Sequence, residues 1–350
     1  FQNICKERIE TGRLYIMNID NCNTHSSFND KINMSNLCCE ITLPTKPLQH
    51  IDDKDAEIAL CVLGAINMGE VSLSELPKAC DVLVRSLDFV IEEQSYPVKA
   101  ALHMKQRRSI GIGLINLAYF LAKNKLKYDS KEALNLVDEY MEHFSYYCLK
   151  ASMELAKEIG ACEWFNKTKY SDGILPIDTY NKNVDKLTSR KLSLDWDDLR
   201  KDIEKHGLRN STFGAVMPCE SSSLISNSTN GIEPPRNLVS VKQSKKGKIK
   251  QCVPEVSKLK NHYTTAFEMK DNTGYLNICA IIQKWIDQAI STNNYYNPLM
   301  YEDGNIPLSV VMKDIFYHYS LGGKTLYYCN SYDGKMDEDE SGCAGGACSL

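Results

Sequence analysis

The stretch Met34-Ser35-Asn36-Leu37-Cys38-Cys39-Glu40-Ile41 places an amide, two thiols and a carboxylate close together in the chain. Residues 42–47 follow it and contain two prolines, which disfavour a helix and predict an extended exit. Side chains alternate between two faces in extended chain, so Asn36, Cys38 and Glu40 are expected on one face, with the second thiol on the other. The alternative interpretation is that both cysteines are buried as small hydrophobic residues, a common state of free cysteine.

The composition excludes several classes of protein. The 350 residues carry a formal net charge of -4, so no basic field favours binding to nucleic acid. No apolar run approaches the roughly 18 residues that a membrane span needs, and the polar start does not predict a signal peptide. The 14 cysteines are scattered without a C-x-x-C motif, which disfavours both a secreted disulfide scaffold and a zinc site. We therefore expect a cytoplasmic protein without a bound metal.

Hydrophobic periodicity and helix-stop signals predict the remaining elements. Residues 76–93 show helical spacing, and Ser72 or Ser74 could cap that helix. The G-x-G at 111–113 lacks the rest of a dinucleotide motif, so close backbone packing is expected there. Helices alternate with short strands and no repeat appears, which favours an α/β architecture. Other helices are expected at 1–12, 131–158, 195–206, 276–291 and 307–321, strands at 13–19, 56–68, 211–216 and 324–330, and a basic hairpin at 238–252.

The stretch Met217-Pro218-Cys219-Glu220-Ser221-Ser222-Ser223 opens the segment after the strand expected at 211–216. Serine hydroxyls and free backbone N–H groups at the start of a helix can bind an anion. Serine also caps helices commonly, and on the residues alone this ordinary cap is the favoured interpretation.

Taken in order, the motifs of the chain resemble the C-terminal part of the large, catalytic subunit of class I ribonucleotide reductase. The resemblance is collinear over essentially all 350 residues, and its specificity comes from the joint order of motifs that are weak singly. They are Asn36-Leu37-Cys38-x-Glu40, Arg107-Arg108-x-Ile110-Gly111-Ile112-Gly113, Pro218-x-Glu220-Ser221-Ser222, Asn230-Gly231-Ile232-Glu233-Pro234-Pro235-Arg236, Thr325-Leu326-Tyr327-Tyr328 and Cys343-x4-Cys348.

The resemblance implies a radical reduction of ribonucleoside diphosphates to deoxyribonucleoside diphosphates for DNA synthesis. A thiyl radical on Cys38 would abstract the 3′ hydrogen of the ribose. Glu40 would take the proton of the 3′-hydroxyl as general base, and Asn36 would hydrogen-bond the sugar hydroxyls. Cys61 corresponds to one member of the dithiol that reduces the radical intermediate.

The resemblance also assigns the C-terminal residues. Tyr327 and Tyr328 correspond to a stacked pair that relays the radical to the active cysteine. Without the family, the expected arrangement is two strand tyrosines on opposite faces. Cys343 and Cys348 correspond to a mobile dithiol that re-reduces the active-site disulfide by thiol–disulfide exchange.

The serine-rich turn corresponds in the family to the site for the substrate diphosphate, which reverses the preference for an ordinary serine cap. Two residues depart from the family pattern: Cys39 stands at a usually apolar position, and Cys219 at a position where serine is common. Neither departure removes a catalytic group. The diphosphate site would comprise Pro218, Cys219, Glu220, Ser221 and Ser222.

The fold implied by the resemblance is the second half of a ten-stranded α/β barrel with a central finger loop and C-terminal helices. Residues 1–330 would form this part of the barrel domain and residues 331–350 a flexible redox-active tail. The chain starts without methionine. The N-terminal half, with the second active-site cysteine, is therefore expected elsewhere: in a separate polypeptide, in a processed precursor, or in sequence missing from a partial record.

The implied partners are the N-terminal half of the large subunit, a small subunit that supplies the radical from its own metal cofactor, and thioredoxin or glutaredoxin as reductant. Helix 307–321 resembles part of the surface that receives the small subunit's C-terminal tail. No cofactor is expected on this chain. Two other classes remain as alternatives: a non-catalytic module that binds the small subunit, and a simple thiol–disulfide oxidoreductase that uses Cys343 and Cys348.

Overall fold

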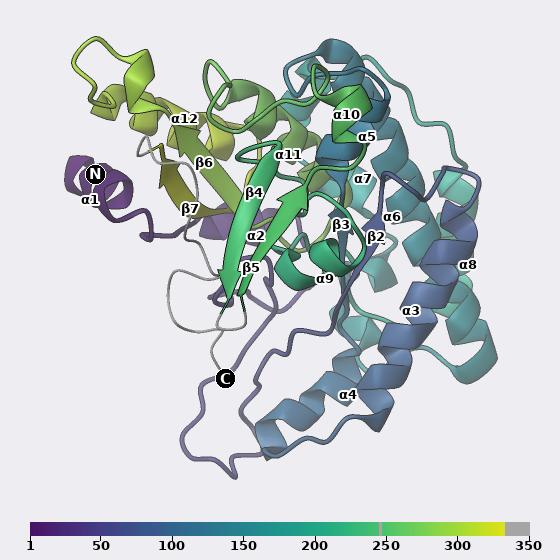
Figure 1. The fold of residues 1–350 in the computed structure, drawn as a ribbon. Helices are drawn as coiled ribbons and strands as arrows, with labels where there is room; N and C mark the ends of the chain where they lie inside the picture. Colours follow the sequence, from purple (N-terminus) through teal and green to yellow (C-terminus); the bar gives the residue numbers. More distant parts are fainter. Residues whose placement is uncertain (245–246, 333–350) are drawn as a thin grey trace.

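The computed structural model describes residues 1–244 and 247–332, and it combines a parallel sheet with a layer of helices (Figure 1). The strands are β1 (Ile16–Met17), β2 (Leu63–Asn67), β3 (Gly111–Ile115), β4 (Val239–Ser244), β5 (Gly247–Cys252), β6 (Thr292–Tyr296) and β7 (Thr325–Ser331). The helices are α1 (Gln2–Thr11), α2 (Ile19–Thr24), α3 (Leu76–Glu93), α4 (His103–Arg107), α5 (Leu117–Lys123), α6 (Lys131–Ile159), α7 (Pro176–Thr179), α8 (Trp196–His206), α9 (Glu220–Ile225), α10 (Val256–Leu259), α11 (Thr273–Trp285) and α12 (Leu308–Ser320).

The main sheet runs from β2 to β1 through a series of parallel pairings. β2 pairs with β3, and a bridge between Ile112 and Gly214 joins β3 to the extended chain around residue 214. A second bridge, Val216 to Ile290, leads to β6, which pairs in parallel with β7. β1 closes this order as an antiparallel neighbour of β7. The α/β class is confirmed. The described residues form no closed barrel, so the ten-stranded barrel stays a prediction.

The pairing of β6 with β7 contains a shift of register. Thr292 lies opposite Leu326, whereas Asn294 lies opposite Cys329. One residue of β6, Asn293, therefore faces two residues of β7, which is the arrangement of a β-bulge. The bulge falls at positions 327 and 328.

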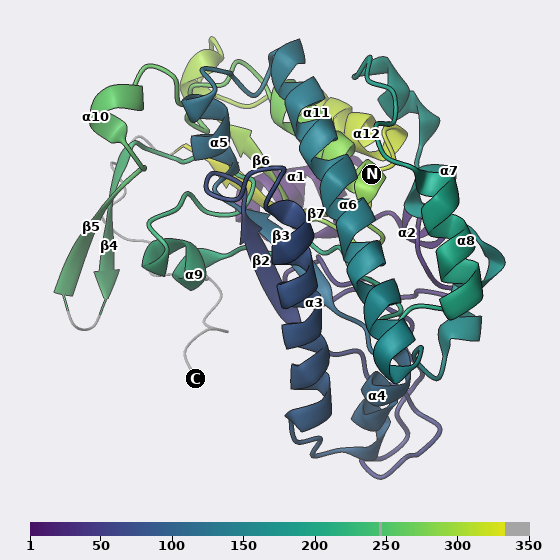
Figure 2. The same ribbon diagram turned by 90° about the vertical axis from the view of Figure 1, so that its right-hand side faces the viewer.

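The long helix α6 lies beside α3 in the helical layer, as Figure 2 shows. Ser130 caps its first turn by accepting a hydrogen bond from the amide of Ala133, and Gly160 ends it with a φ of 91°, which glycine adopts readily. Its apolar face packs against α3, α8 and α11. The prediction of one helix at 131–158 ended by Gly160 is confirmed.

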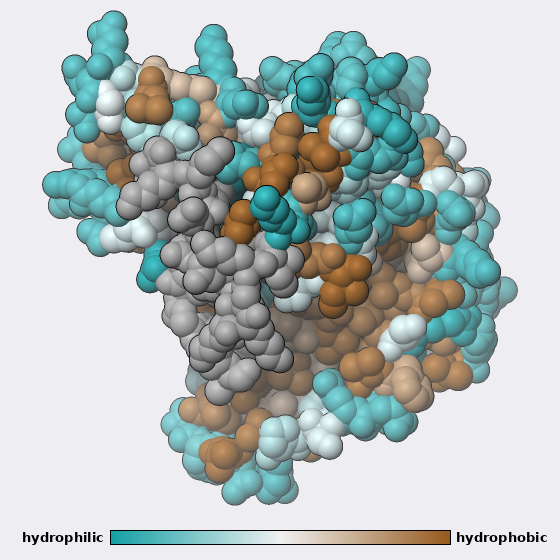
Figure 3. Space-filling view, viewed as in Figure 1, coloured by the Kyte–Doolittle hydropathy of each residue, from teal (hydrophilic) through white to brown (hydrophobic). Residues whose placement is uncertain are grey.

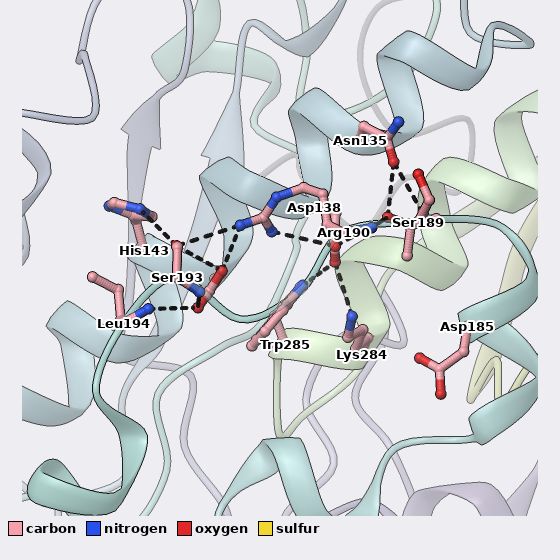
Figure 4. Close-up of polar contacts among 12 residues, drawn as sticks. Asn135, Asp138, His143, Asp185, Ser189, Arg190, Ser193, Leu194, Lys284 and Trp285 are labelled. Atoms are coloured by element: carbon pink, nitrogen blue, oxygen red, sulfur yellow. Dashed lines mark hydrogen bonds and ion pairs between the residues drawn. The ribbon is translucent and has the colours of Figure 1, made fainter.

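Two carboxylates on α6 bind neighbouring segments through a buried network (Figure 4). Asp138 accepts hydrogen bonds from Lys284 Nζ at 3.1 Å and Trp285 Nε1 at 2.8 Å, both at the end of α11. Arg190 donates to Asp138 at 3.3 Å and to Glu142 at 2.6 Å. Every charge in the network has an opposite charge or a hydrogen-bond donor beside it, so it anchors α11 and the chain around residue 190 to α6.

The glycines at 111 and 113 allow β3 to pack closely between its neighbours. A Cβ atom at Gly111 would lie 2.5 Å from a methyl of Leu63, and one at Gly113 would lie 2.6 Å from the sulfur of Met217. These separations are shorter than van der Waals contact, so a side chain at either position would displace the adjacent strand. The expectation of close backbone packing is confirmed.

Several predicted elements differ from the structure. The strand expected at 13–19 is limited to Ile16–Met17, because α2 begins at Ile19. The strand expected at 211–216 forms only the two bridges at Gly214 and Val216. The helix expected at 276–291 begins at Thr273 and ends at Trp285, since the chain after it is extended and bonds to the sheet.

The predicted serine cap of α3 is wrong. Glu75 precedes the helix, and its side chain makes no capping bond to the helix. The Ser72 hydroxyl instead donates to the Glu75 carboxylate at 2.5 Å, and the Ser72 amide donates to it at 2.9 Å. The serine is therefore part of the preceding turn.

The face of the molecule drawn in Figure 1 is hollowed. Figure 3 shows apolar side chains gathered in this hollow, between the β4–β5 hairpin and α4. In the part of the chain that the structure describes, no helix combines the length and the apolar composition that crossing a membrane requires.

Candidate active site

Residues 34–41 contain a tight turn and are not an extended segment. The Cys39 amide donates to the carbonyl of Asn36 at 3.1 Å, and Cys39 has a φ of 67°, in the left-handed region. The extended-chain prediction for this loop is therefore wrong. The Asn36 side chain closes the turn, because its Oδ1 accepts from the Ile41 amide at 3.0 Å and its Nδ2 donates to Glu40 Oε1 at 2.8 Å.

The turn still brings the amide, one thiol and the carboxylate together. Asn36 Nδ2 lies 3.7 Å from the sulfur of Cys61, which comes from the residues just before β2. Cys38 is half-buried and Cys61 is exposed, whereas Cys39 is buried. The turn therefore joins Asn36 to Glu40 and brings Asn36 close to Cys61, while the roles of these residues stay predictions.

Glu40 is a buried carboxylate without a cation among its hydrogen-bond donors. Its side chain is 2% exposed, and its donors are Asn36 and the Ser291 hydroxyl, which lies 3.3 Å from Oε2. Burial raises the pKa of Glu40, and the hydrogen bonds from Asn36 and Ser291 offset only part of this effect. A carboxylate with a raised pKa next to a thiol suits proton abstraction near neutral pH.

The thiol of Cys38 faces a phenol. The Tyr327 hydroxyl donates to Cys38 Sγ at 3.7 Å, and Ser291 Oγ donates to the Cys38 carbonyl at 2.5 Å. Ser291 therefore binds both the backbone of the turn and the carboxylate of Glu40. No sequence motif pointed to Ser291, because its role depends on the bridge that places Ile290 in the sheet.

The thiols of Cys39 and Cys61 differ in their access to solvent. Desolvation of its sulfur, with the charge of Glu40 nearby, raises the pKa of Cys61 to about 11. Burial raises the pKa of Cys39 to about 12. Both thiols are protonated at neutral pH, but only Cys61 is exposed beside the turn.

Three tyrosine rings gather at β7. The ring centroids of Tyr327 and Tyr328 are 4.0 Å apart with an angle of 46° between the planes, so the two rings do not lie on opposite faces of the strand. Tyr15, which precedes β1, lies 4.7 Å from Tyr327 and 5.6 Å from Tyr328. The two rings are thus in contact but tilted, and their predicted role as a radical relay stays a prediction. Sequence reasoning missed Tyr15, which the antiparallel register of β1 with β7 places opposite Tyr327.

A buried arginine fixes this corner of the sheet. Arg8 is fully buried, and its NH1 donates to the carbonyls of Leu14 at 2.6 Å and Tyr327 at 2.8 Å. Its NH2 donates to Asn294 Oδ1 at 2.9 Å. The guanidinium thus links α1, β6 and β7 through neutral acceptors, and burial lowers its pKa.

The serine-rich turn leads into α9, and its cap is not a serine. Cys219 precedes the helix without a side-chain capping bond, while its amide donates to Asn230 Oδ1 at 2.8 Å. Asn230 also donates to Glu220 at 3.0 Å. The Ser221 and Ser222 side chains are exposed. The ordinary serine-cap interpretation is therefore wrong, and the assignment of a diphosphate site at Pro218, Cys219, Glu220, Ser221 and Ser222 stays a prediction.

Two further assignments are not accessible in the structure. Cys343 and Cys348 lie outside the described residues.

Within residues 1–244 and 247–332, no group of three or more histidine, cysteine, aspartate or glutamate side chains is placed to hold a metal ion.

Comparison with known proteins adds an independent observation. The family model described as ribonucleotide reductase, barrel domain, matches residues 1–329. Ribonucleoside-diphosphate reductase subunit alpha of Haemophilus influenzae is 53% identical over 358 residues, which cover 100% of this chain and 47% of that protein. The corresponding subunit 1 alpha of Escherichia coli is 48% identical over 363 residues, covering 100% and 48%. Subunit alpha of enterobacteria phage T4 is 42% identical over 347 residues, covering 97% and 45%. The chain spans about half the length of the curated relatives it matches.

Proposed function

The chain belongs to the family of the ribonucleotide reductase barrel domain, and on that premise we propose that it is the C-terminal catalytic portion of a ribonucleoside-diphosphate reductase. One observation carries the proposal. The thiol of Cys38 lies 3.7 Å from the Tyr327 hydroxyl, in the same turn as the buried, raised-pKa carboxylate of Glu40. A radical donor then contacts a hydrogen-abstracting thiol, and a base lies two residues further along the same turn.

Radical transfer uses the tyrosine pair. A phenoxyl radical on Tyr328 takes an electron and a proton from the Tyr327 hydroxyl, which leaves the radical on Tyr327. Tyr327 then takes the hydrogen atom of the Cys38 thiol, across the 3.7 Å contact. The two phenols end the sequence protonated, and the unpaired electron resides on the sulfur of Cys38.

The ribose is reduced at the turn that contains Asn36, Cys38 and Glu40. The Cys38 thiyl abstracts the hydrogen from C3′ of the ribose, and Glu40 accepts the proton of the 3′-hydroxyl. Asn36 Nδ2, which already holds Glu40 at 2.8 Å, binds the sugar hydroxyls. The 2′-hydroxyl takes a proton from the reducing dithiol and leaves as water. After the dithiol has reduced the sugar, Cys38 returns the hydrogen atom to C3′ and its thiyl radical forms again.

A dithiol supplies the two electrons. Cys61, exposed beside Asn36, is one of its members, and its partner comes from outside this chain. The balance is one ribonucleoside diphosphate plus two thiols giving one deoxyribonucleoside diphosphate, one disulfide and one water. Cys343 and Cys348 then exchange with that disulfide and are reduced in turn by thioredoxin or glutaredoxin.

The substrate diphosphate binds at the start of α9. The exposed hydroxyls of Ser221 and Ser222 support this assignment, as does their place directly after the strand that carries the bridge to Ile290. Pro218, Cys219 and Glu220 complete the turn. No other cofactor is assigned to this chain.

The proposed assembly has three further members. The N-terminal half of the large subunit completes the barrel. The small subunit supplies the radical from its metal cofactor; the name "subunit alpha" of the relatives supports a second kind of subunit. We also place the enzyme in the cytoplasm, in the synthesis of deoxyribonucleotides for DNA replication. The apolar hollow in Figure 3 is consistent with a surface that another part of the enzyme covers.

The test compares two neighbouring thiols in the complete large subunit assembled with its small subunit. We expect Cys38→Ser to abolish the conversion of CDP to dCDP, because a hydroxyl hydrogen is too strongly bound for this transfer. Cys39→Ser is the matched control, since it makes the same change at the adjacent thiol, which is buried. It should keep turnover within about threefold of the unmodified enzyme, as expected of a substitution that only repacks.

Reduction of CDP by the Cys38→Ser enzyme at an undiminished rate would reject the proposed function. It would favour the alternative of a non-catalytic module that binds the small subunit. That alternative is not favoured here, because a pure binding surface does not need the contact between Tyr327 and Cys38.

A further inference from the structure

The stacking of Tyr327 on Tyr328 contradicts the geometry of a regular strand. Consecutive side chains of a strand point to opposite faces, so adjacent tyrosines should be separated by the backbone. Their ring centroids are nevertheless 4.0 Å apart. The cause is the β-bulge, in which both tyrosines lie opposite the single residue Asn293 of β6.

A bulge leaves a backbone group without its usual partner in the ladder, and this group needs another acceptor when it is buried. Here Asn293 Oδ1 accepts the hydrogen bond of the Tyr328 amide at 3.0 Å. The other end of the same side chain is also bound: Nδ2 donates to Glu233 Oε1 at 3.0 Å and approaches the Tyr295 hydroxyl at 3.4 Å. Asn293 is 5% exposed, so water does not compete for these bonds.

We propose that Asn293 is a positioning residue for radical transfer, which holds the bulge in β7 and thereby keeps the two tyrosine rings stacked. The inference rests on the proposed function, in which Tyr328 passes the radical to Tyr327. The side chain acts through the backbone of Tyr328 and not on either phenol. Glu233 orients the amide so that its oxygen faces β7.

The alternative state of this strand explains why the bond is needed. If Asn293 could not accept from Tyr328, a regular ladder would recover the lost backbone bond by shifting the register by one residue. Such a shift moves every following side chain to the opposite face of the sheet. The two phenols would then be separated by the strand, and transfer of a proton and an electron between them would stop.

The chain contains a matched control in Asn272, the residue before α11, which binds a backbone amide of β6. Asn272 is 1% exposed, its Oδ1 accepts from the Tyr295 amide at 2.8 Å, and its Nδ2 donates to the Asp314 carboxylate at 2.8 Å. It therefore satisfies a backbone amide of β6 and bonds a carboxylate, as Asn293 does for β7. Within the described part of the chain, the Asn272 side chain forms no hydrogen bond with Tyr327 or Tyr328, so its replacement should cost comparable stability without disturbing the bulge.

The experiment measures CDP reduction by the complete large subunit with its small subunit. We expect Asn293→Ala to lower kcat roughly 100-fold, the size expected from misplacing reacting groups by about 1 Å, and to leave KM for CDP unchanged. Asn272→Ala should lower the thermal midpoint similarly but keep kcat per folded molecule within about twofold. A crystal structure of Asn293→Ala should show the two rings apart.

A rescue experiment removes the possibility that Asn293→Ala merely unfolds the site. Asn293→Asp keeps the acceptor for the Tyr328 amide but faces the Glu233 carboxylate, so it should also have a low kcat. Adding Glu233→Gln provides a donor to the new carboxylate. The hydrogen bond between positions 293 and 233 then forms with its direction exchanged, and the Tyr328 amide still donates to position 293. The double variant should recover kcat by about tenfold over Asn293→Asp alone, as coupled neighbours do.

Equal kcat values for Asn293→Ala and Asn272→Ala would overturn the inference, and so would stacked rings in the Asn293→Ala crystal structure. Neither result would contradict the proposed function, which is tested by the Cys38→Ser variant. If Cys38→Ser reduced CDP, the proposed function would fail first, whatever the result for Asn293.

Discussion

Two buried carboxylates in this molecule have pKa values that are shifted in opposite directions. Glu142 on α6 is fully buried, yet its pKa is lowered, because bonds from Arg190 and from the amides of Ser193 and Leu194 outweigh the effect of desolvation. Glu40 is 2% exposed, and its pKa is raised, because desolvation outweighs its two neutral donors, Asn36 and Ser291.

The difference separates a structural from a chemical role. A carboxylate paired with a guanidinium is held in its charged form and holds two elements together. A carboxylate buried without a cation keeps its affinity for a proton, at a cost in stability. The fold therefore stabilises the network in Figure 4 and leaves Glu40 poised to accept a proton.

The largest effect is expected from Glu40→Gln. The amide keeps the shape of the side chain and can still accept from Asn36, but it cannot accept the proton, so kcat for CDP reduction should fall by about 10²- to 10⁴-fold. The thermal midpoint should not fall, because the buried charge is removed. Undiminished turnover in the complete enzyme would show that Glu40 is not the base.

The next effect concerns stability. Glu142→Ala leaves Arg190 with only Asp138 and should lower the unfolding free energy by about 3 kcal/mol, as for a broken buried pair. Turnover per folded molecule should be unchanged. Glu154→Ala is the control on the same helix; its exposed pair with Lys157 should contribute less than about 0.5 kcal/mol. Equal losses in the two variants would contradict the structural role of Glu142.

The pH dependence of stability should have opposite signs at the two sites. Glu142 has a lowered folded-state pKa, so its stabilisation is present above the unfolded value of about 4.3 and is lost as the pH falls through its folded pKa. Glu40 has a raised folded-state pKa, so its cost is absent in acid and appears as the pH rises through and above about 4.3.

Thermal midpoints of Glu40→Gln, Glu142→Gln and the unmodified protein, measured from about pH 4 to pH 7, would check these signs. The gain from Glu40→Gln should grow with pH, and the loss from Glu142→Gln should also grow with pH. A gain from Glu40→Gln that is constant over this range would show that its carboxyl group titrates normally.

The smallest effect should come from Ser291→Ala. It removes the longer of the two hydrogen bonds to Glu40, so the pKa of Glu40 should rise further and the acid limb of kcat/KM should move to higher pH. The substitution also removes the hydrogen bond to the Cys38 carbonyl, so turnover at the plateau should fall by no more than about tenfold, the loss expected for two neutral hydrogen bonds. A limb that moves to lower pH would contradict the assignment of that limb to Glu40.

The sequence predicted those features that depend on neighbouring residues. The long helix α6 followed from apolar spacing and Gly160, and β7 from its β-branched and aromatic residues. The turn at Asn36 was missed because its left-handed residue is Cys39, where glycine or asparagine is the usual signal. The turn nevertheless joins Asn36 to Glu40.

Other parts of the site depend on partners that are remote in sequence. Ser291 reaches the turn only because Val216 pairs with Ile290, and Asn293 reaches Tyr328 only because the register shifts. No periodicity in a single segment contains that information. The stacking of the tyrosines required the family resemblance, since the strand pattern alone predicted opposite faces.

The pairing of β7 with both β1 and β6 has a consequence for biosynthesis. Arg8 contacts Tyr327 across 319 positions of the sequence, and Tyr327 contacts Cys38 across 289. Helices α3 and α6 can associate soon after both are synthesised, but the turn at Cys38 must wait for β7 to leave the ribosome. A nascent chain released before residue 327 would therefore hold a formed helical layer and the Cys38 thiol without its phenol.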